Sequence, residues 1–201
     1  GRRADGYHLL QSVFMLIDWC DTLHLDVKLD GTIQRIDLNT PLPANDLIVR
    51  AASALQSASG TTLGAEIRID KQIPAQAGMG GGSSDAASTL LALNKLWGLN
   101  WPVSKLLPIG LALGADVPFF LFGQNAFVEG IGELLQAVSL PESCFLLVYP
   151  KVHIPTVDIF KDPNLTRNHP PVTISDFIDS PNLEQFGRND CEEVGDVPAL
   201  S

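Results

Sequence analysis

The sequence is poor in positive charge. Its 13 Lys and Arg residues are outnumbered by 23 Asp and Glu residues, which gives a formal net charge of −10 and a pI near 4.6. Proteins that bind duplex nucleic acid or an anionic membrane need a spread of positive charge, so neither is expected as a partner. Local cations can still bind a small anionic ligand.

Cysteine and long apolar runs are also scarce. The three cysteines, Cys20, Cys144 and Cys191, are far apart and form neither a CxxC pair nor a zinc-binding spacing. This pattern indicates reduced thiols in a cytoplasmic protein. No apolar run approaches the roughly 18 to 20 residues of a membrane span, and no signal peptide opens the chain.

Apolar residues are plentiful enough for a packed core. The 201 residues, 45% of them hydrophobic, can form one large domain, or one domain and part of another. The chain begins at Gly1 without a methionine and ends in sequence that contains Gly and Pro. We therefore expect a fragment that lacks both termini of a longer protein.

The order of apolar and polar residues predicts a mixed fold. Strands are expected over 7–17, 23–29 and 33–38, forming a meander, and over 65–71. Helices are expected from a cap at 45 or 46 to Gly60, from about 84 to 97, and over 104–113. Short strands are expected over 119–122 and 126–129, and a strand buried on both faces over 144–149. Because strands and helices do not alternate regularly, the pattern favours an α+β fold over a doubly wound α/β fold.

A glycine-rich loop lies between a predicted strand and a predicted helix. Gly78, Gly80, Gly81 and Gly82 occupy four of five positions, and serines follow at 83 and 84. Such a loop can bring several N–H groups onto one anion, and the helix N-terminus behind it adds partial positive charge. A tight turn with capping serines is the alternative, but it needs only one or two glycines. The loop therefore predicts phosphate binding, with the serine hydroxyls near phosphate oxygens or hydrated magnesium.

The two best-known phosphate loops do not fit this stretch. A Walker A loop needs a lysine before its Ser or Thr, and a dinucleotide fingerprint needs a third glycine where Ser83 stands. Residues 74–87, Pro-Ala-Gln-Ala-Gly-Met-Gly-Gly-Gly-Ser-Ser-Asp-Ala-Ala, instead resemble the Pro-x3-Gly-Leu-Gly-Ser-Ser-Ala-Ala loop of the GHMP kinases. Residues 1–8, 45–52, 114–120 and 154–156 resemble one branch of that superfamily, whose alcohol substrate carries a cytidine diphosphate.

The resemblance runs from Gly1 to about Cys191 and implies a fold and an activity. It implies the two-lobed GHMP kinase fold, with a nucleotide-binding lobe over 1–140 and the truncated start of a substrate lobe over 141–201. It also implies an ATP- and Mg²⁺-dependent kinase of terpenoid biosynthesis that phosphorylates a small-molecule hydroxyl, as a monomer or weak homodimer. The alternatives are a GHMP kinase for a non-nucleotide alcohol and a noncatalytic module that binds nucleotide or RNA; the acidic charge argues against RNA.

Asp116 is the candidate catalytic residue. It lies in Gly114-Ala115-Asp116-Val117-Pro118, at a turn that leaves a predicted helix. Phosphoryl transfer needs a group that orients or deprotonates the acceptor hydroxyl. A turn aspartate is common in any fold, and it is the resemblance that gives Asp116 the family's catalytic role. The family's partner lysine lies in a Pro-Ala-Lys-Leu-Asn motif, which we expect to precede Gly1.

The resemblance also implies the ligand contacts. Tyr7, His8 and Phe160 match residues that hold the cytosine ring, and Thr156 lies in the adjacent substrate loop; by residue type alone they would more often be structural. Lys71 and Asp46 match positions around the adenine, although Asp46 and Asp85 stand where an amide is found, and an ionised acid cannot donate as an amide does. The ATP phosphates are expected on Pro74, Ala75, Gln76, Ala77, Gly78, Met79, Gly80, Gly81, Gly82, Ser83 and Ser84.

Overall fold

The computed structural model describes residues 9–75, 77–148, 159, 161–166, 169–178, 180 and 189–191. Five of the predicted site residues lie outside the described residues: Tyr7, His8, Gln76, Thr156 and Phe160. Within the described part of the chain, no helix is both long and apolar enough to cross a membrane.

The larger sheet has its most buried strand in the middle. Strands β2 (Thr22–Lys28), β3 (Ile33–Asp37) and β4 (Gly64–Asp70) lie in the order β2-β4-β3. Ala65, Ile67 and Ile69 alternate along β4 and are fully buried, which places β4 in the centre. β4 is antiparallel to β2 and parallel to β3. The predicted meander is therefore wrong, because β4 inserts between the two strands that precede it.

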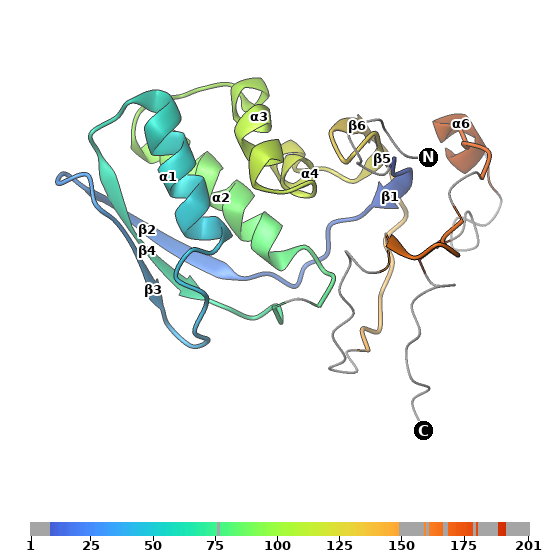
Figure 1. Cartoon of the computed structure of the whole chain (residues 1–201), viewed down its shortest axis with the longest axis horizontal. Coiled ribbons are helices and arrows are strands. Elements are labelled where there is room, and N and C mark those ends of the chain that lie inside the picture. The colour runs from blue at the N-terminus through green and yellow to red at the C-terminus, as the bar shows by residue number, and fades with distance from the viewer. Residues whose placement is uncertain are drawn as a thin grey trace.

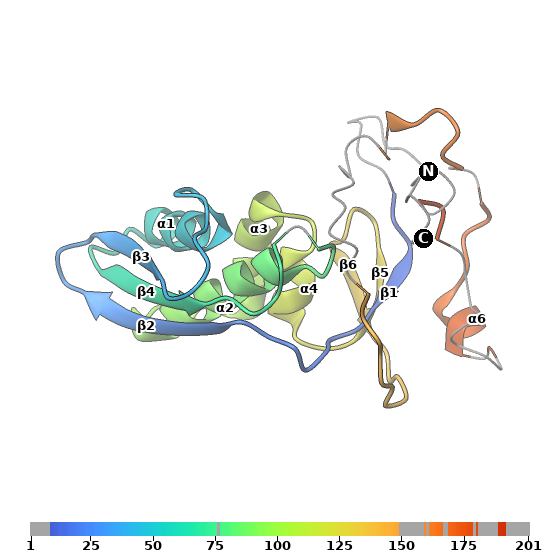
Figure 2. The ribbon, with the colours of Figure 1, turned by 90° about the horizontal axis from the view of Figure 1, so that it is seen from below.

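Helices cover one face of this sheet. Helix α1 (Leu47–Ser59) makes the crossover that joins the parallel strands β3 and β4, and α2 (Gly81–Leu96) packs beside it, as Figures 1 and 2 show. Helix α3 (Val103–Leu113) packs on both. The core lies between helices and sheet and includes Ile48, Leu55, Ile67, Ile69, Leu90, Leu93 and Leu106, all at most 1% exposed.

Two predicted strands are absent from the described structure. Residues 117–122 form the helix α4 (Val117–Phe122), because Pro118 suits a first helical turn and Gly123, at φ 70°, ends the helix in the left-handed conformation. Residues 144–148 form no strand and are exposed, with Leu146 at 92%. A strand needs an edge to pair with, and no described strand pairs with this segment.

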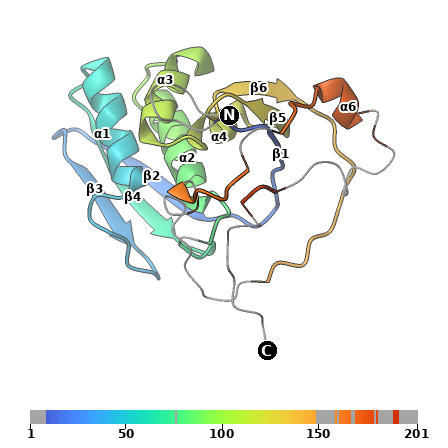
Figure 3. The ribbon, with the colours of Figure 1, turned by 45° about the vertical axis from the view of Figure 1, so that its right-hand side comes forward.

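A smaller antiparallel sheet follows the helices. Strands β1 (Ser12–Phe14), β5 (Ala126–Glu129) and β6 (Leu134–Ala137) lie in the order β1-β5-β6. The short helix α6 (Ile174–Ile178) lies near β5 in Figure 3, and the ring centroids of Phe127 and Phe177 are 6.4 Å apart. The Gln11 side chain accepts from the Val172 N–H at 2.8 Å and donates to the Val172 carbonyl at 2.6 Å. These contacts fix the later segment against β1 and β5.

Two neighbouring leucines of α2 test this packing. Leu90 is fully buried, whereas Leu91 is 38% exposed. We expect Leu90→Ala to lower the free energy of unfolding by about 2–5 kcal/mol, because it leaves a cavity in a close-packed core. Leu91→Ala, the matched control, should cost well under half as much in urea unfolding followed by circular dichroism. Equal losses for the two variants would contradict the packing of α2.

Candidate active site

The glycine loop turns into a helix earlier than predicted. Helix α2 begins at Gly81 rather than near Ser84, so Gly81 and Gly82 belong to its first turn. Gly78 and Gly80 have φ values of 74° and 66°, a region that glycine adopts freely and other residues avoid. The first N–H groups of a helix have no partner within the helix. The loop therefore presents unpaired backbone donors at a helix N-terminus, as anion binding requires.

Close packing surrounds the start of α2. A Cβ atom on Gly80 would lie 3.0 Å from the ring of Phe120 in α4. A Cβ atom on Gly81 would lie 3.0 Å from Ile73 Cγ2 and 3.1 Å from Lys71 Nζ. Glycine at these two positions thus lets α4 and the segment after β4 approach the helix backbone.

Asp116 lies on a turn beside this helix start. A Cβ atom on Gly114 would lie 3.9 Å from Ser83 Oγ, so the turn that holds Asp116 is next to the first turn of α2. On its other side, a Cβ atom on Gly132 would lie 2.5 Å from the Ala115 carbonyl oxygen. The turn is therefore held between α2 and the connection of β5 with β6.

The Asp116 carboxyl is available for chemistry. Asp116 is the residue before α4, and within the described structure its side chain accepts no capping hydrogen bond from that helix. The residue is solvent-exposed, but neighbouring atoms still remove part of the water around its carboxyl, and this desolvation raises its pKa. A raised pKa makes a carboxylate a better proton acceptor.

Lys71 forms a buried ion cluster with two carboxylates. Its Nζ lies 2.9 Å from Asp85 Oδ2 in α2 and also bonds Asp21 Oδ2, ahead of β2. The three side chains are only 2–6% exposed. Asp21 Oδ1 accepts in addition from the N–H groups of Gln72, at 2.6 Å, and Ile73, at 2.8 Å. Sequence reasoning missed Asp21, because nothing distinguishes it there from any acid that precedes a strand.

The two acids of this cluster titrate differently. Burial raises the pKa of Asp85 to about 6, although Lys71 opposes the shift. Burial also acts to raise the pKa of Asp21, but the bonds from Lys71 and from the Ile73 and Gln72 N–H groups outweigh it, so the pKa is lowered. The pKa of Lys71 is raised. Burial alone would lower it, but the two carboxylate partners outweigh burial because they stabilise the charged ammonium. Above about pH 6 the cluster carries one net negative charge.

Asp46 has structural partners in the fold. Its Oδ1 accepts from the Val49 N–H at 3.2 Å, which caps α1, and lies 2.6 Å from Arg35 Nη1. Arg35 also bonds Asp37 and the carbonyl groups of Pro43 and Leu42. The structure thus gives the Asp46 carboxylate a local role, and the adenine contact stays a prediction.

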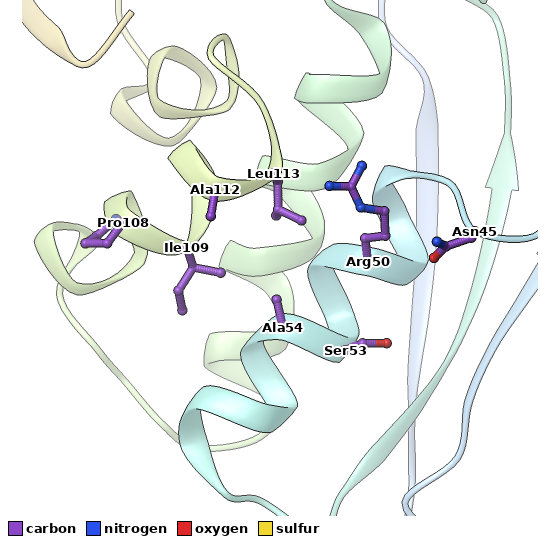
Figure 4. A pocket seen from close by; sticks show the side chains of 8 residues that line it. All are labelled: Asn45, Arg50, Ser53, Ala54, Pro108, Ile109, Ala112 and Leu113. Carbon is purple, nitrogen blue, oxygen red and sulfur yellow. The ribbon is translucent and has the colours of Figure 1, made fainter. Parts of the chain in front are cut away.

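Two surface hollows flank the site. The larger, of about 590 Å³, lies between α1 and α3 and has one charged lining residue, Arg50 (Figure 4). The smaller, of about 330 Å³, lies between the start of β2 and α2 and includes Asp21 and Asp85. Neither is lined by Gly78–Gly82 or Asp116. The features that mark the candidate site are therefore the backbone N–H groups at the start of α2 and the Asp116 carboxylate, rather than either hollow.

Comparison with known proteins identifies the family. Residues 46–124 match the GHMP kinases N terminal domain. The chain is 63% identical over 194 residues to a 4-diphosphocytidyl-2-C-methyl-D-erythritol kinase of Albidiferax ferrireducens and 55% identical over 197 residues to one of Ralstonia nicotianae. The alignments cover 96% and 98% of this chain, and 67% and 68% of those proteins.

Solved structures show the same relationship. A crystal structure of 4-(cytidine 5'-diphospho)-2C-methyl-D-erythritol kinase matches 87% of this chain and 62% of its own, with 34% identity and a TM-score of 0.70. A homoserine kinase from Cytophaga hutchinsonii, 20% identical with a TM-score of 0.54 over 85% of this chain and 57% of its own, shows a shared fold alone. The chain thus spans about two thirds of the length of the two sequence relatives, and 57–62% of the two chains of known structure.

The α+β fold, the glycine loop before α2 and the family match define a GHMP kinase, as predicted. Within that superfamily, the chain belongs to the 4-diphosphocytidyl-2-C-methyl-D-erythritol kinase family. The boundary expected near residue 140 and the roles of individual site residues stay predictions.

The raised pKa of Asp85 gives a test of the ion cluster. Between about pH 4 and pH 6 the folded state binds a proton that the unfolded state releases, so ionising Asp85 makes stability fall as pH rises. Asp85→Asn still accepts a hydrogen bond from Lys71 but cannot ionise. We expect its free energy of unfolding, relative to wild type, to improve by about 1–3 kcal/mol from pH 4 to pH 7.

Urea unfolding across that pH range measures the difference. Asp18→Asn, at an exposed position ahead of β2, serves as the control and should keep the wild-type dependence. A parallel pH dependence for Asp85→Asn and wild type would show that folding does not raise the pKa of Asp85.

Proposed function

We propose that the protein containing this chain transfers the γ-phosphoryl group of ATP to the 2-hydroxyl of 4-diphosphocytidyl-2-C-methyl-D-erythritol, a step of isoprenoid biosynthesis. The observation that carries the proposal is the 55–63% identity to kinases of that name across 96–98% of the chain. The site supports it, since a helix N-terminus with unpaired donors lies beside an aspartate on an adjacent turn.

In this proposal the first turn of α2 holds the phosphates of ATP. The N–H groups from Gly78 to Ser83 and the partial positive charge of the helix N-terminus stabilise the phosphate oxygens. Ser83 and Ser84 offer hydroxyl oxygens of the type that Mg²⁺ prefers, so these residues fit the ion that accompanies ATP. Bound Mg²⁺ would neutralise part of the phosphate charge.

Asp116 acts on the acceptor hydroxyl. Its carboxylate orients that group and takes its proton as the oxygen bonds to phosphorus and ADP leaves. Catalysis then depends mainly on positioning and charge stabilisation, which suits a turn packed between two elements.

The proposal also includes contacts with the cytosine and adenine rings, several of them from residues outside the described part of the chain. Tyr7, His8 and Phe160 hold the cytosine ring, Thr156 lies in the adjacent loop, and Lys71 and Asp46 line the adenine region. The nucleotide lobe spans 1–140 and the substrate lobe begins at 141. The protein acts in the cytoplasm as a monomer or weak homodimer; its free cysteines, Cys20, Cys144 and Cys191, agree with a reducing compartment.

Gly81→Val tests the phosphate-binding loop. A Cβ atom at this position already approaches Ile73 Cγ2 to 3.0 Å and Lys71 Nζ to 3.1 Å, so valine must shift the start of α2. We expect at least a tenfold loss of ATP affinity by calorimetry in the full-length protein, with the fold retained. Ser88→Val puts the same side chain on an exposed position of α2 as the control. Unchanged affinity in Gly81→Val would remove the loop from ATP binding.

Asp116→Asn tests the catalytic role. The amide keeps the shape of the side chain but loses its charge and its proton affinity, so kcat should fall by about 10²- to 10⁴-fold. The KM for ATP should change little, because the loop binds the phosphates independently. Asp26→Asn controls for the loss of one acidic charge. A kcat within threefold of wild type, measured with the full-length protein, would exclude Asp116 from the mechanism.

A further inference from the structure

We infer that Asp21 is a positioning residue of the ATP site: it holds in register the segment 71–73, of which Lys71 and Ile73 pack against the first turn of α2. The inference rests on the proposed function, because the element that Asp21 positions is the proposed phosphate-binding turn. Asp21 lies just before β2, outside the glycine loop and outside the turn that carries Asp116.

The two oxygens of Asp21 bind three consecutive residues. Oδ2 pairs with the Lys71 ammonium, and Oδ1 accepts from the N–H groups of Gln72 at 2.6 Å and Ile73 at 2.8 Å. Lys71 lies 50 positions later in the chain, so this is a contact between distant segments. The Asp21 side chain is 2% exposed, so these bonds form away from competing water.

The residues that Asp21 holds connect β4 to the glycine loop. Ile73 Cγ2 and Lys71 Nζ are the atoms that a Cβ atom on Gly81 would meet at 3.0 and 3.1 Å. Gly81, the first residue of α2, therefore packs directly against Lys71 and Ile73. Asp21 holds the first by its ammonium and the second by its backbone N–H. A shift of this segment would move the helix N-terminus and its unpaired N–H groups.

Lys71 is fixed on its other sides as well. Asn39 Oδ1 accepts from the Lys71 N–H, and Asn39 Nδ2 donates to the Lys71 carbonyl, both at 2.9 Å. The ammonium also bonds Asp85 in the second turn of α2. With Asp21 in place, Lys71 thus links β2, the segment after β4 and α2. Asp21 acts through these contacts rather than by touching a substrate.

Replacing Asp21 tests positioning without leaving a buried charge unpaired. If Asp21 is replaced, Lys71 and Asp85 still form a one-to-one ion pair, so no buried charge is left unpaired. Asp21→Ala removes both the second anion and the acceptor for the Gln72 and Ile73 N–H groups. Asp21→Asn removes the anion and keeps an acceptor oxygen, which makes it the conservative variant.

The test is steady-state kinetics of the full-length kinase with both substrates varied. We expect Asp21→Ala to raise the KM for ATP at least tenfold, with kcat and the KM for the cytidine-diphosphate alcohol within threefold of wild type. Asp21→Asn should recover much of the loss, to within about threefold of the wild-type KM for ATP. Asp18→Asn changes an exposed acid of the same segment and should leave all three constants unchanged.

Each outcome decides the inference. A wild-type KM for ATP in Asp21→Ala would overturn it, as would equal effects on both substrates, which indicate a structural role only. If Asp21→Ala does not fold, Asp21→Asn decides: it must raise the KM for ATP above wild type without changing that of the alcohol. If the wild-type protein shows no turnover, the proposed function fails. In that case ATP calorimetry on the same variants tests Asp21 separately: undiminished affinity in both overturns the inference.

Discussion

To bind phosphate as proposed, the start of helix α2 has to leave its N–H groups unpaired and yet hold them in a fixed place. Unpaired donors do not position themselves, because the interactions that would fix them are reserved for a ligand. The structure meets this constraint by packing around the turn. Phe120 of α4 meets Gly80, Ile73 and Lys71 meet Gly81, and the turn before α4 approaches Ser83. The glycines therefore serve two purposes: they expose the backbone to an anion and admit the neighbours that hold it.

The charge of the neighbouring ion cluster also affects the N-terminus of α2. A helix N-terminus favours an anion, but the Lys71 cluster below it holds two carboxylates against one ammonium. Burial is the main cause of the raised pKa of Asp85, and the charge of Asp21 adds to it. Lys71 is engaged by these two carboxylates within the fold, so its ammonium is not free to match the phosphates in the proposed mechanism.

The sequence predicted the local features of the fold and missed the long-range ones. Period-2 alternation located β4, and the Asp46 cap and Gly60 located the ends of α1, because these signals lie within a few residues. The order β2-β4-β3 depends on which strand is paired along both of its edges, and neighbouring residues in the sequence do not reveal this. Residues 117–122 are apolar enough for a strand, but they form a helix because Pro118 favours a first helical turn and Gly123 ends the helix. Asp21 could not be found because its partners lie some 50 positions away.

Long-range contacts also involve Asp46 and Asp85, the two acids at positions where the family resemblance leads us to expect an amide. Each is matched by a cation inside the fold: Asp46 by Arg35 at 2.6 Å and Asp85 by Lys71 at 2.9 Å. An ionised carboxylate has only acceptors, so neither side chain can donate to an adenine ring as an amide would. The raised pKa of Asp85 makes one exception, since below about pH 6 its carboxyl is protonated and gains a donor. In the proposed function, hydrogen-bond donors to the adenine base at neutral pH therefore come from groups other than these two carboxylates.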